Sequence, residues 1–89
     1  MARVVASERF IQEAASVWSP KVKKELETAL KNIAVFPEIG SCNIPESAVA
    51  EFGEGIRKLV VGPFDAVYEY EAETDVAYLY AIIPQRMVR

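Results

Sequence analysis

A lysine, two acids and two tyrosines recur in the C-terminal half of the chain, and two arginines follow them. These side chains are Lys58, Asp65, Glu69, Tyr78, Tyr80, Arg86 and Arg89. Cations in such a group can hold a phosphate and stabilise the negative charge that develops when RNA is cut through a 2′-hydroxyl, while a tyrosine or a lysine moves protons. The residue types therefore fit an enzyme that acts on RNA, but they also fit a polar sheet face whose charges form weak surface pairs.

The acids Asp65, Glu69 and Glu71 form a second candidate group. Alternate residues of a strand point the same way about 7 Å apart, so these carboxylates could gather around a metal ion. A solvated strand face explains them equally well. The chain has one cysteine, Cys42, and no histidine, so there is neither an imidazole to activate the thiol nor a cysteine–histidine zinc cluster. We expect no metal ion and no cofactor.

The overall charge argues against a general nucleic-acid binder. Ten Lys and Arg residues against thirteen Asp and Glu residues give a net charge of −3, so the molecule as a whole repels a phosphate backbone. The 89 residues, 52% of them apolar, suffice for one small domain with its own core, which we expect to span residues 1–89. No apolar run is long enough for a signal peptide or a membrane span, so we expect a cytoplasmic protein that does not contact a membrane.

The N-terminal half predicts a short strand followed by two helices. Residues 3–6 are a β-type run that stops at Ser7, a good N-cap for a first helix. Ser19 is placed to cap a second helix, with proline at its first position, and this helix should stop before Pro37. The apolar stripe of the second helix is Val22, Leu26, Ala29, Ile33 and Phe36. The two helices should form a hairpin with one apolar face, and we expect Trp18 and the tyrosines in the core and its rim.

The remainder predicts one long loop and three antiparallel strands. Residues 40–55 are expected to form the loop, which is long for so compact a domain and so either packs on the body or serves a partner. Gly53 and Gly55 should make a tight backbone turn at its end. Strands are expected over 56–61, 64–71 and 76–83. The fold class is thus α+β: an N-terminal strand and a helical hairpin packed on a small, mostly antiparallel sheet.

The turns predict which strand residues share a face. A two-residue turn places Lys58 opposite Val67, and a four-residue turn places Val67 opposite Tyr80. The face expected under the helices holds Arg57, Leu59, Val61, Phe64, Ala66, Tyr68, Tyr70, Ala77, Leu79, Ala81 and Ile83. The face expected to be open holds Ile56, Lys58, Val60, Asp65, Val67, Glu69, Glu71, Val76, Tyr78, Tyr80 and Ile82. A slip of one residue would exchange the faces of the strand beyond it.

In order and spacing, these elements resemble the RelE/ParE superfamily of bacterial type II toxins. A short strand and a helical hairpin ending in "FPEIG" are followed by "EFGEGIRKLVVGPFDAVYEY" and "DVAYLYAIIPQR". The most specific parts are Pro37 and Gly40 after the second helix, the run Gly55–Leu59, the Pro63–Tyr68 strand, and Arg86 after the last strand. The resemblance covers nearly the whole chain.

This resemblance implies a toxin that inhibits growth and is blocked by a small antitoxin encoded beside it. The antitoxin of such a pair wraps the toxin with a helix or an added strand, and we expect a homodimer or a toxin–antitoxin heterotetramer. RelE-like members cut mRNA on the ribosome with basic residues on the open sheet face. ParE-like members inhibit DNA gyrase and lack that nuclease set.

Carried over position by position, the resemblance nominates few residues for RNA cleavage. Lys58 and Arg86 match basic positions of the nuclease branch and are the candidate catalytic residues, with Tyr80 as a weaker candidate; Arg57 and Arg89 are the candidate target contacts. Ile56 and Asp65 stand where nuclease members carry cations, and a carboxylate beside a scissile phosphate opposes its charge.

We therefore favour a ParE-like toxin that inhibits a target such as DNA gyrase. The alternatives are a ribosome-dependent endoribonuclease, and a degenerate member that only binds its antitoxin.

Overall fold

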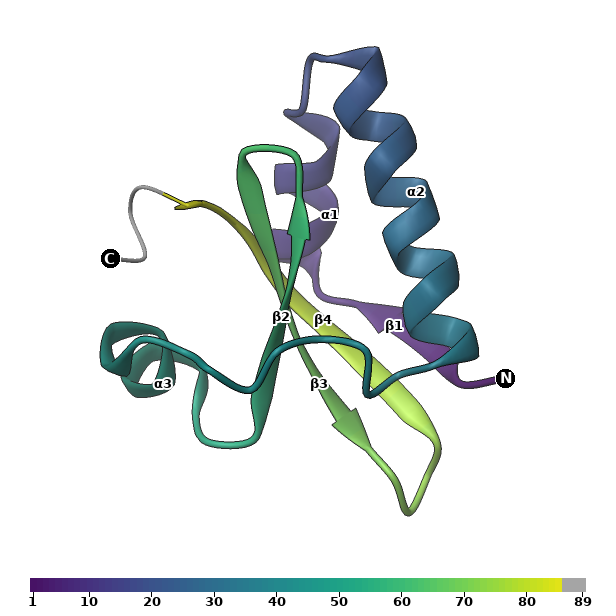
Figure 1. The fold of residues 1–89 in the computed structure, drawn as a ribbon, viewed down its shortest axis with the longest axis vertical. Helices are drawn as coiled ribbons and strands as arrows, with labels where there is room; N and C mark the ends of the chain where they lie inside the picture. The colour runs from purple at the N-terminus through teal and green to yellow at the C-terminus, as the bar shows by residue number, and fades with distance from the viewer. Residues whose placement is uncertain (86–89) are drawn as a thin grey trace.

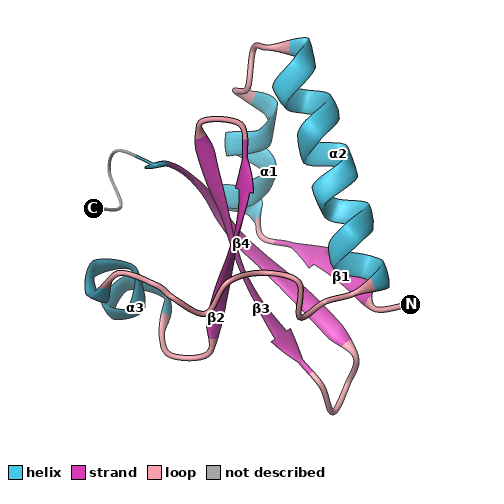
Figure 2. Cartoon of the chain, in the orientation of Figure 1, coloured by secondary structure: helices cyan, strands magenta, loops and turns pink. Residues whose placement is uncertain are grey.

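The computed structural model describes residues 1–85, so the candidate residues Arg86 and Arg89 lie outside the described part of the chain. Along the chain the elements are β1 (Arg3–Ala6), α1 (Glu8–Ala15), α2 (Pro20–Val35), α3 (Glu46–Phe52), β2 (Ile56–Val61), β3 (Phe64–Glu71) and β4 (Val76–Pro84) (Figure 1). The strands form one sheet in the order β1-β4-β3-β2. β1 runs parallel to β4 and the other pairs are antiparallel, which confirms the α+β fold (Figure 2).

Serine caps start both helices of the hairpin, as the sequence predicts. The Ser7 hydroxyl accepts a hydrogen bond from the Phe10 amide at 3.0 Å, and the Ser19 hydroxyl accepts one from the Val22 amide at 3.3 Å. Each bond satisfies an amide that has no partner within its own helix. The hairpin packs on one face of the sheet, where the main core consists of Phe10, Leu26, Ala29, Ile33, Val61, Ala66, Tyr68, Ala77, Leu79 and Ile82.

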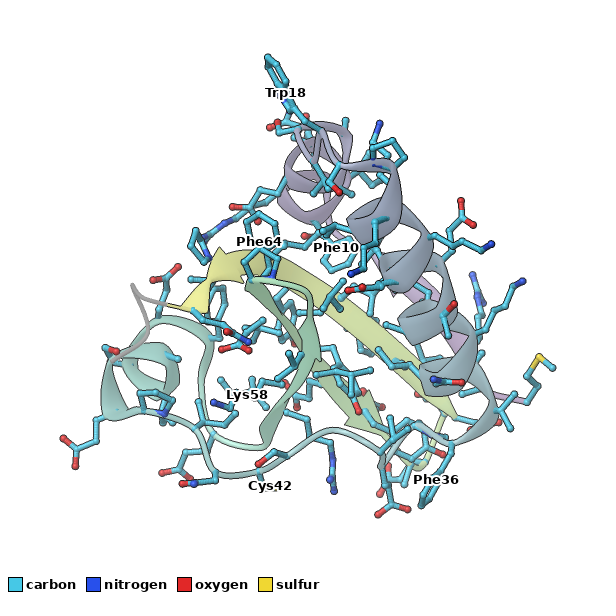
Figure 3. The ribbon with its side chains drawn as sticks, turned by 45° about the horizontal axis from the view of Figure 1, so that its top comes forward. Phe10, Trp18, Phe36, Cys42, Lys58 and Phe64 are labelled. Carbon is cyan, nitrogen blue, oxygen red and sulfur yellow. The ribbon has the colours of Figure 1, made fainter. Side chains whose placement is uncertain are left out.

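Two aromatic residues expected in the core are instead exposed. Trp18 lies in the turn between α1 and α2, is 92% exposed and projects from the apex of the hairpin (Figure 3). Phe36 follows the last helical residue of α2 and is 58% exposed, because the backbone leaves the helix there and turns the ring away from the stripe. The buried stripe therefore ends at Ile33.

The loop predicted over residues 40–55 contains a helix, α3. It is only seven residues long and its N-cap, Pro45, has no side chain that can accept a hydrogen bond, so the usual start signal is absent. Gly53 and Gly55 after it have φ values of 94° and 84°, which confirms the expected tight glycine turn. Figure 1 shows α3 set apart from the α1–α2 hairpin, on the other side of the sheet.

A β-bulge shifts the register between β3 and β4. The predicted partners Lys58 and Val67 do face each other, but Val67 pairs with Ala81 rather than with Tyr80, while Tyr68 pairs with Leu79. Tyr80 is therefore an extra residue on β4, and the strand beyond it exchanges faces. Ile82 consequently joins the main core under the helices, and Ile83 joins the opposite face, the reverse of the predicted assignment.

Candidate functional site

Lys58, the first candidate catalytic residue, lies in the middle of the edge strand β2. Its amide and carbonyl form a bridge to Ser41 at 3.0 and 2.8 Å, so the chain before α3 runs along this edge. Figure 3 places Lys58 on the side of β2 that faces α3. Its ammonium Nζ lies 3.9 Å from Oδ2 of Asp65, and its side chain is 29% exposed. The cation is thus partly covered and has an acid beside it.

Asp65 lies near the start of β3, diagonally across from Lys58, as the strand pairing predicts. The residue is only 3% exposed, so the expectation of an open position is wrong. The Gln85 amide nitrogen lies 3.4 Å from Oδ1 and supplies a second polar contact. A carboxylate in such surroundings needs nearby donors or cations, and Lys58 is the cation that lies within 4 Å of Asp65 in the described part of the chain.

Tyr80, the weaker catalytic candidate, donates its hydroxyl to Oε1 of Glu69 at 2.9 Å. Burial raises the pKa of this phenol, and the hydrogen bond to the Glu69 carboxylate raises it further. Its ring stacks on Phe52 of α3, with centroids 6.1 Å apart and ring planes 5° apart. The Tyr80 hydroxyl therefore keeps its proton at neutral pH, and its ring anchors a helix.

The face of the sheet that was expected to be open is covered in part by α3. Ala48 of this helix packs with Ile56 and Val67, each of which is 2% exposed. The partly buried residues of this second cluster are Ile44, Phe52, Tyr80 and Ile83. The polar groups Lys58, Asp65 and Glu69 therefore border a small apolar cluster instead of lying on a solvated surface.

Arg9 belongs to this region although the sequence did not nominate it. Its guanidinium lies 5.3 Å from the centroid of the Phe52 ring, with Nη1 2.6 Å from the Glu51 carboxylate and Nε 3.3 Å from that of Glu13. The bond to Glu51 is the main cause that raises the pKa of Arg9. The Arg9–Glu13 pair has the helical i,i+4 spacing that a sequence can reveal, whereas the contact with α3 could not be foreseen without that helix.

Arg57, a candidate target contact, is directed at the turn that follows α2 and precedes α3. Its Nη1 donates to the carbonyl oxygens of Glu38 and Gly40 at 3.1 and 3.0 Å. Tyr68 supports the same turn, because its hydroxyl donates to the Pro37 carbonyl at 2.7 Å and accepts from the Gly40 amide at 2.8 Å. The structure thus assigns Arg57 contacts that hold the "FPEIG" turn.

The arrangement has few of the parts that catalysis by proton transfer needs. Residues 1–85 contain no group of three His, Cys, Asp or Glu side chains placed to hold a metal ion. Glu69 is bonded to Tyr80, and Asp65 lies beside Lys58. In the described part of the chain, two of the candidate catalytic residues, Lys58 and Tyr80, therefore each lie beside an acid.

Comparison with known proteins gives one family and several solved structures that share one fold. The model of the family described as "ParE toxin of type II toxin-antitoxin system, parDE" matches residues 4–89. No curated protein sequence matches the chain. Within residues 1–85, no helix has the length and apolar content needed to cross a lipid bilayer.

Solved structures of toxins share the fold at low sequence identity. A chain of the intact E. coli RelBE toxin–antitoxin complex superposes with a TM-score of 0.71 at 16% identity, covering 94% of this chain and 96% of that one. The RelBE2 complex from Mycobacterium tuberculosis gives 0.72 at 13% identity, with 94% and 98% covered. A metal-bound toxin from Helicobacter pylori gives 0.69 at 12% identity, with both chains covered completely. At these identities the similarity establishes the common fold alone.

Proposed function

This chain belongs to the ParE toxin family of type II toxin–antitoxin systems, and we propose that it inhibits growth by binding a cellular target such as DNA gyrase, without cutting RNA. We propose further that a cognate antitoxin neutralises it in the cytoplasm, and that the chain forms a homodimer or a toxin–antitoxin heterotetramer.

The pairing of Lys58 with Asp65 carries the proposal. A nuclease site must present a free positive charge to the phosphate in the transition state. Here the ammonium has a carboxylate 3.9 Å away, and that carboxylate is almost fully buried and so is not removed by a simple side-chain rotation into water. Attraction of a phosphate to this pair would be weak because the two charges cancel at a distance.

The state of Tyr80 supports the same reading. A phenol that acts as a base must lose its proton, but burial and the Glu69 carboxylate both raise the pKa of Tyr80. The adjacent negative charge of Glu69 would also repel a phosphate. Tyr80 is thus a poor proton acceptor at neutral pH.

A groove between α2 and the β2 edge supports the proposal of a protein partner. Its volume is about 560 Å³, and Ala29, Leu59 and Val60 supply its apolar surface, with Lys21 and Lys24 on its rim. Ser41 covers this edge at Lys58, and the groove lies beside the following residues, Leu59 and Val60. A strand edge beside an apolar groove is a common place for a partner segment to bind. Two of the structural relatives were solved as complexes with their antitoxins.

Controlled expression in a bacterial host tests this proposal. Gyrase inhibition should produce filamentous cells and a DNA-damage response, with translation still running at the onset. Early arrest of translation with cleaved mRNA would instead support RelE-like activity, and unhindered growth would support a degenerate member that only binds its antitoxin.

The RelE-like alternative rests on one observation, the partial exposure of Lys58, whose side chain is 29% accessible. If a nuclease site exists, the double substitution Lys58→Ala with Arg86→Ala should abolish toxicity. Full toxicity of the double variant would eliminate this alternative.

A further inference from the structure

The segment from the Ser41 bridge to the start of β2 is attached to β2 at both of its ends. Ser41 pairs with Lys58 of β2, and the chain returns into the same strand at Ile56 after α3. A segment whose two ends lie close together can move as one piece without pulling on the rest of the fold. Both ends of this segment, residues 42–55, are therefore held at β2.

The ends of α3 have the features of a hinge. Gly53 and Gly55 take φ values of 94° and 84°, which glycine adopts at little cost, and a Cβ at Gly53 would meet no atom within 4 Å. The N-terminal end has no side-chain cap, so no local hydrogen bond of that kind stabilises the first turn. A helix of seven residues is too short to persist without tertiary contacts.

Within residues 1–85, few contacts hold α3 closed. Ala48 is buried against Ile56 and Val67, and Phe52 stacks on Tyr80. The remaining polar contact joins Glu51 to Arg9 of α1, and both side chains are about half exposed at 52% and 48%, so water and salt weaken it. The main core lies on the other side of the sheet and includes no residue of α3.

We propose that α3 is a lid that opens as a unit while the sheet and the α1–α2 hairpin remain folded. Opening uncovers a preformed apolar surface on the sheet, made of Ile56, Val67 and Ile83 with the Tyr80 ring. Elements with few buried contacts open at lower free energy than the global unfolding of a domain. This inference goes beyond the proposed function and does not depend on the identity of the target.

Amide hydrogen exchange on the chain made by cell-free synthesis tests the lid. The amide of Gly53, bonded to the Val49 carbonyl at 2.8 Å, reports α3, and the amide of Tyr68 in β3 reports global unfolding. In the wild-type chain, Gly53 should exchange at least about tenfold faster than Tyr68 after correction for intrinsic rates.

Two variants distinguish the opening of α3 from global unfolding. Phe52→Ala removes the stacking partner of Tyr80, and should speed exchange at Gly53 at least about tenfold. Because the same contact is also lost on global unfolding, exchange at Tyr68 should speed by about the same factor. Leu26→Ala, in the core on the opposite face, should speed exchange at Tyr68 and leave Gly53 unchanged. If Leu26→Ala speeds exchange at Gly53 as much as at Tyr68, α3 is part of the global folding unit and the proposal fails.

A second pair of variants, with smaller structural changes, tests the lid if Phe52→Ala does not fold. Arg9→Ala removes the ion pair and the cation over the Phe52 ring, and should speed exchange at Gly53. Ile11→Ala changes an exposed residue of the same helix and should leave both amides unchanged. Equal exchange at Gly53 in the Arg9→Ala, Ile11→Ala and wild-type chains would contradict the lid.

Discussion

The Nζ atom of Lys58 and the Oδ2 atom of Asp65 lie 3.9 Å apart on neighbouring strands, with the carboxylate side chain only 4% exposed. Lys58 pairs with Val67 and Asp65 with Val60, so the two charged side chains are diagonal neighbours on one sheet face. This relationship converts the expected cationic site into a nearly neutral pair. The electrostatic argument for a ParE-like toxin follows from it.

The Lys58–Asp65 pair should show measurable coupling in a double-mutant cycle. We expect Lys58→Met and Asp65→Asn to be coupled by about 1 kcal/mol in the free energy of unfolding, because one partner is buried and the other is partly screened by water. Urea unfolding of the wild type, both single variants and the double variant measures this. The exposed pair Arg9–Glu51 is the matched control and should couple less strongly, and coupling near zero for Lys58–Asp65 would undercut the charge argument.

Gly40 should tolerate no side chain. A Cβ at this position would lie 2.7 Å from the Tyr68 hydroxyl and 3.0 Å from the Arg57 Cβ, so we expect Gly40→Ala to destabilise the fold by about 1–3 kcal/mol. Thermal or urea unfolding measures the loss. Cys42→Ala in the same segment changes an exposed thiol and should be neutral. Equal stability of the two variants would mean that the turn is not held as described.

The Tyr68 hydroxyl should make stability depend on alkaline pH. Burial raises the pKa of Tyr68 above the ordinary value of 10.0, so the folded state favours the protonated phenol. Its contribution is fully present below the unfolded pKa and is lost as the pH rises through the folded pKa.

Tyr68→Phe tests this dependence directly. At neutral pH the variant should lose about 1–3 kcal/mol, because the Gly40 amide and the Pro37 carbonyl lose their partner. Above pH 10 the difference in unfolding free energy between the two chains should narrow. A constant difference up to pH 11 would contradict the assignment.

Substitution of Trp18 should leave the free energy of unfolding almost unchanged. Because it is 92% exposed, Trp18→Ala should change the free energy of unfolding by less than about 0.5 kcal/mol, whereas Phe10→Ala, at a position 2% exposed, should cost about 3–5 kcal/mol. Trp18 is the one tryptophan of the chain, so its fluorescence should have the red-shifted emission of a hydrated indole. A blue-shifted emission in the isolated chain would show that the ring is covered.

The parts of the fold that follow local rules could be predicted from the sequence. Ser7 and Ser19 start helices through bonds to amides three residues ahead, and Gly62 with a φ of 58° makes the tight turn that pairs Val61 with Phe64. These signals depend on residues close together in the chain. The RelE/ParE resemblance rested on the same kind of cap and turn residues, and the family match confirms it.

The features that escaped prediction depend on tertiary contacts. α3 carries no cap signal and persists because Phe52 meets Tyr80, which is 28 positions further along the chain. The bulge that makes Tyr80 an extra residue on β4 depends on the pairing of two strands, and a single-residue shift changed the faces of Ile82 and Ile83. The burial of Asp65 could not be foreseen from alternation, because the covering of that face comes from elsewhere in the chain.

The most direct test of the central claim is supercoiling by purified DNA gyrase in the presence of the purified chain. We predict that the wild type and Lys58→Ala both inhibit supercoiling, and that neither cleaves mRNA on programmed ribosomes. Uninhibited gyrase together with mRNA cleavage that is lost in Lys58→Ala would contradict the account.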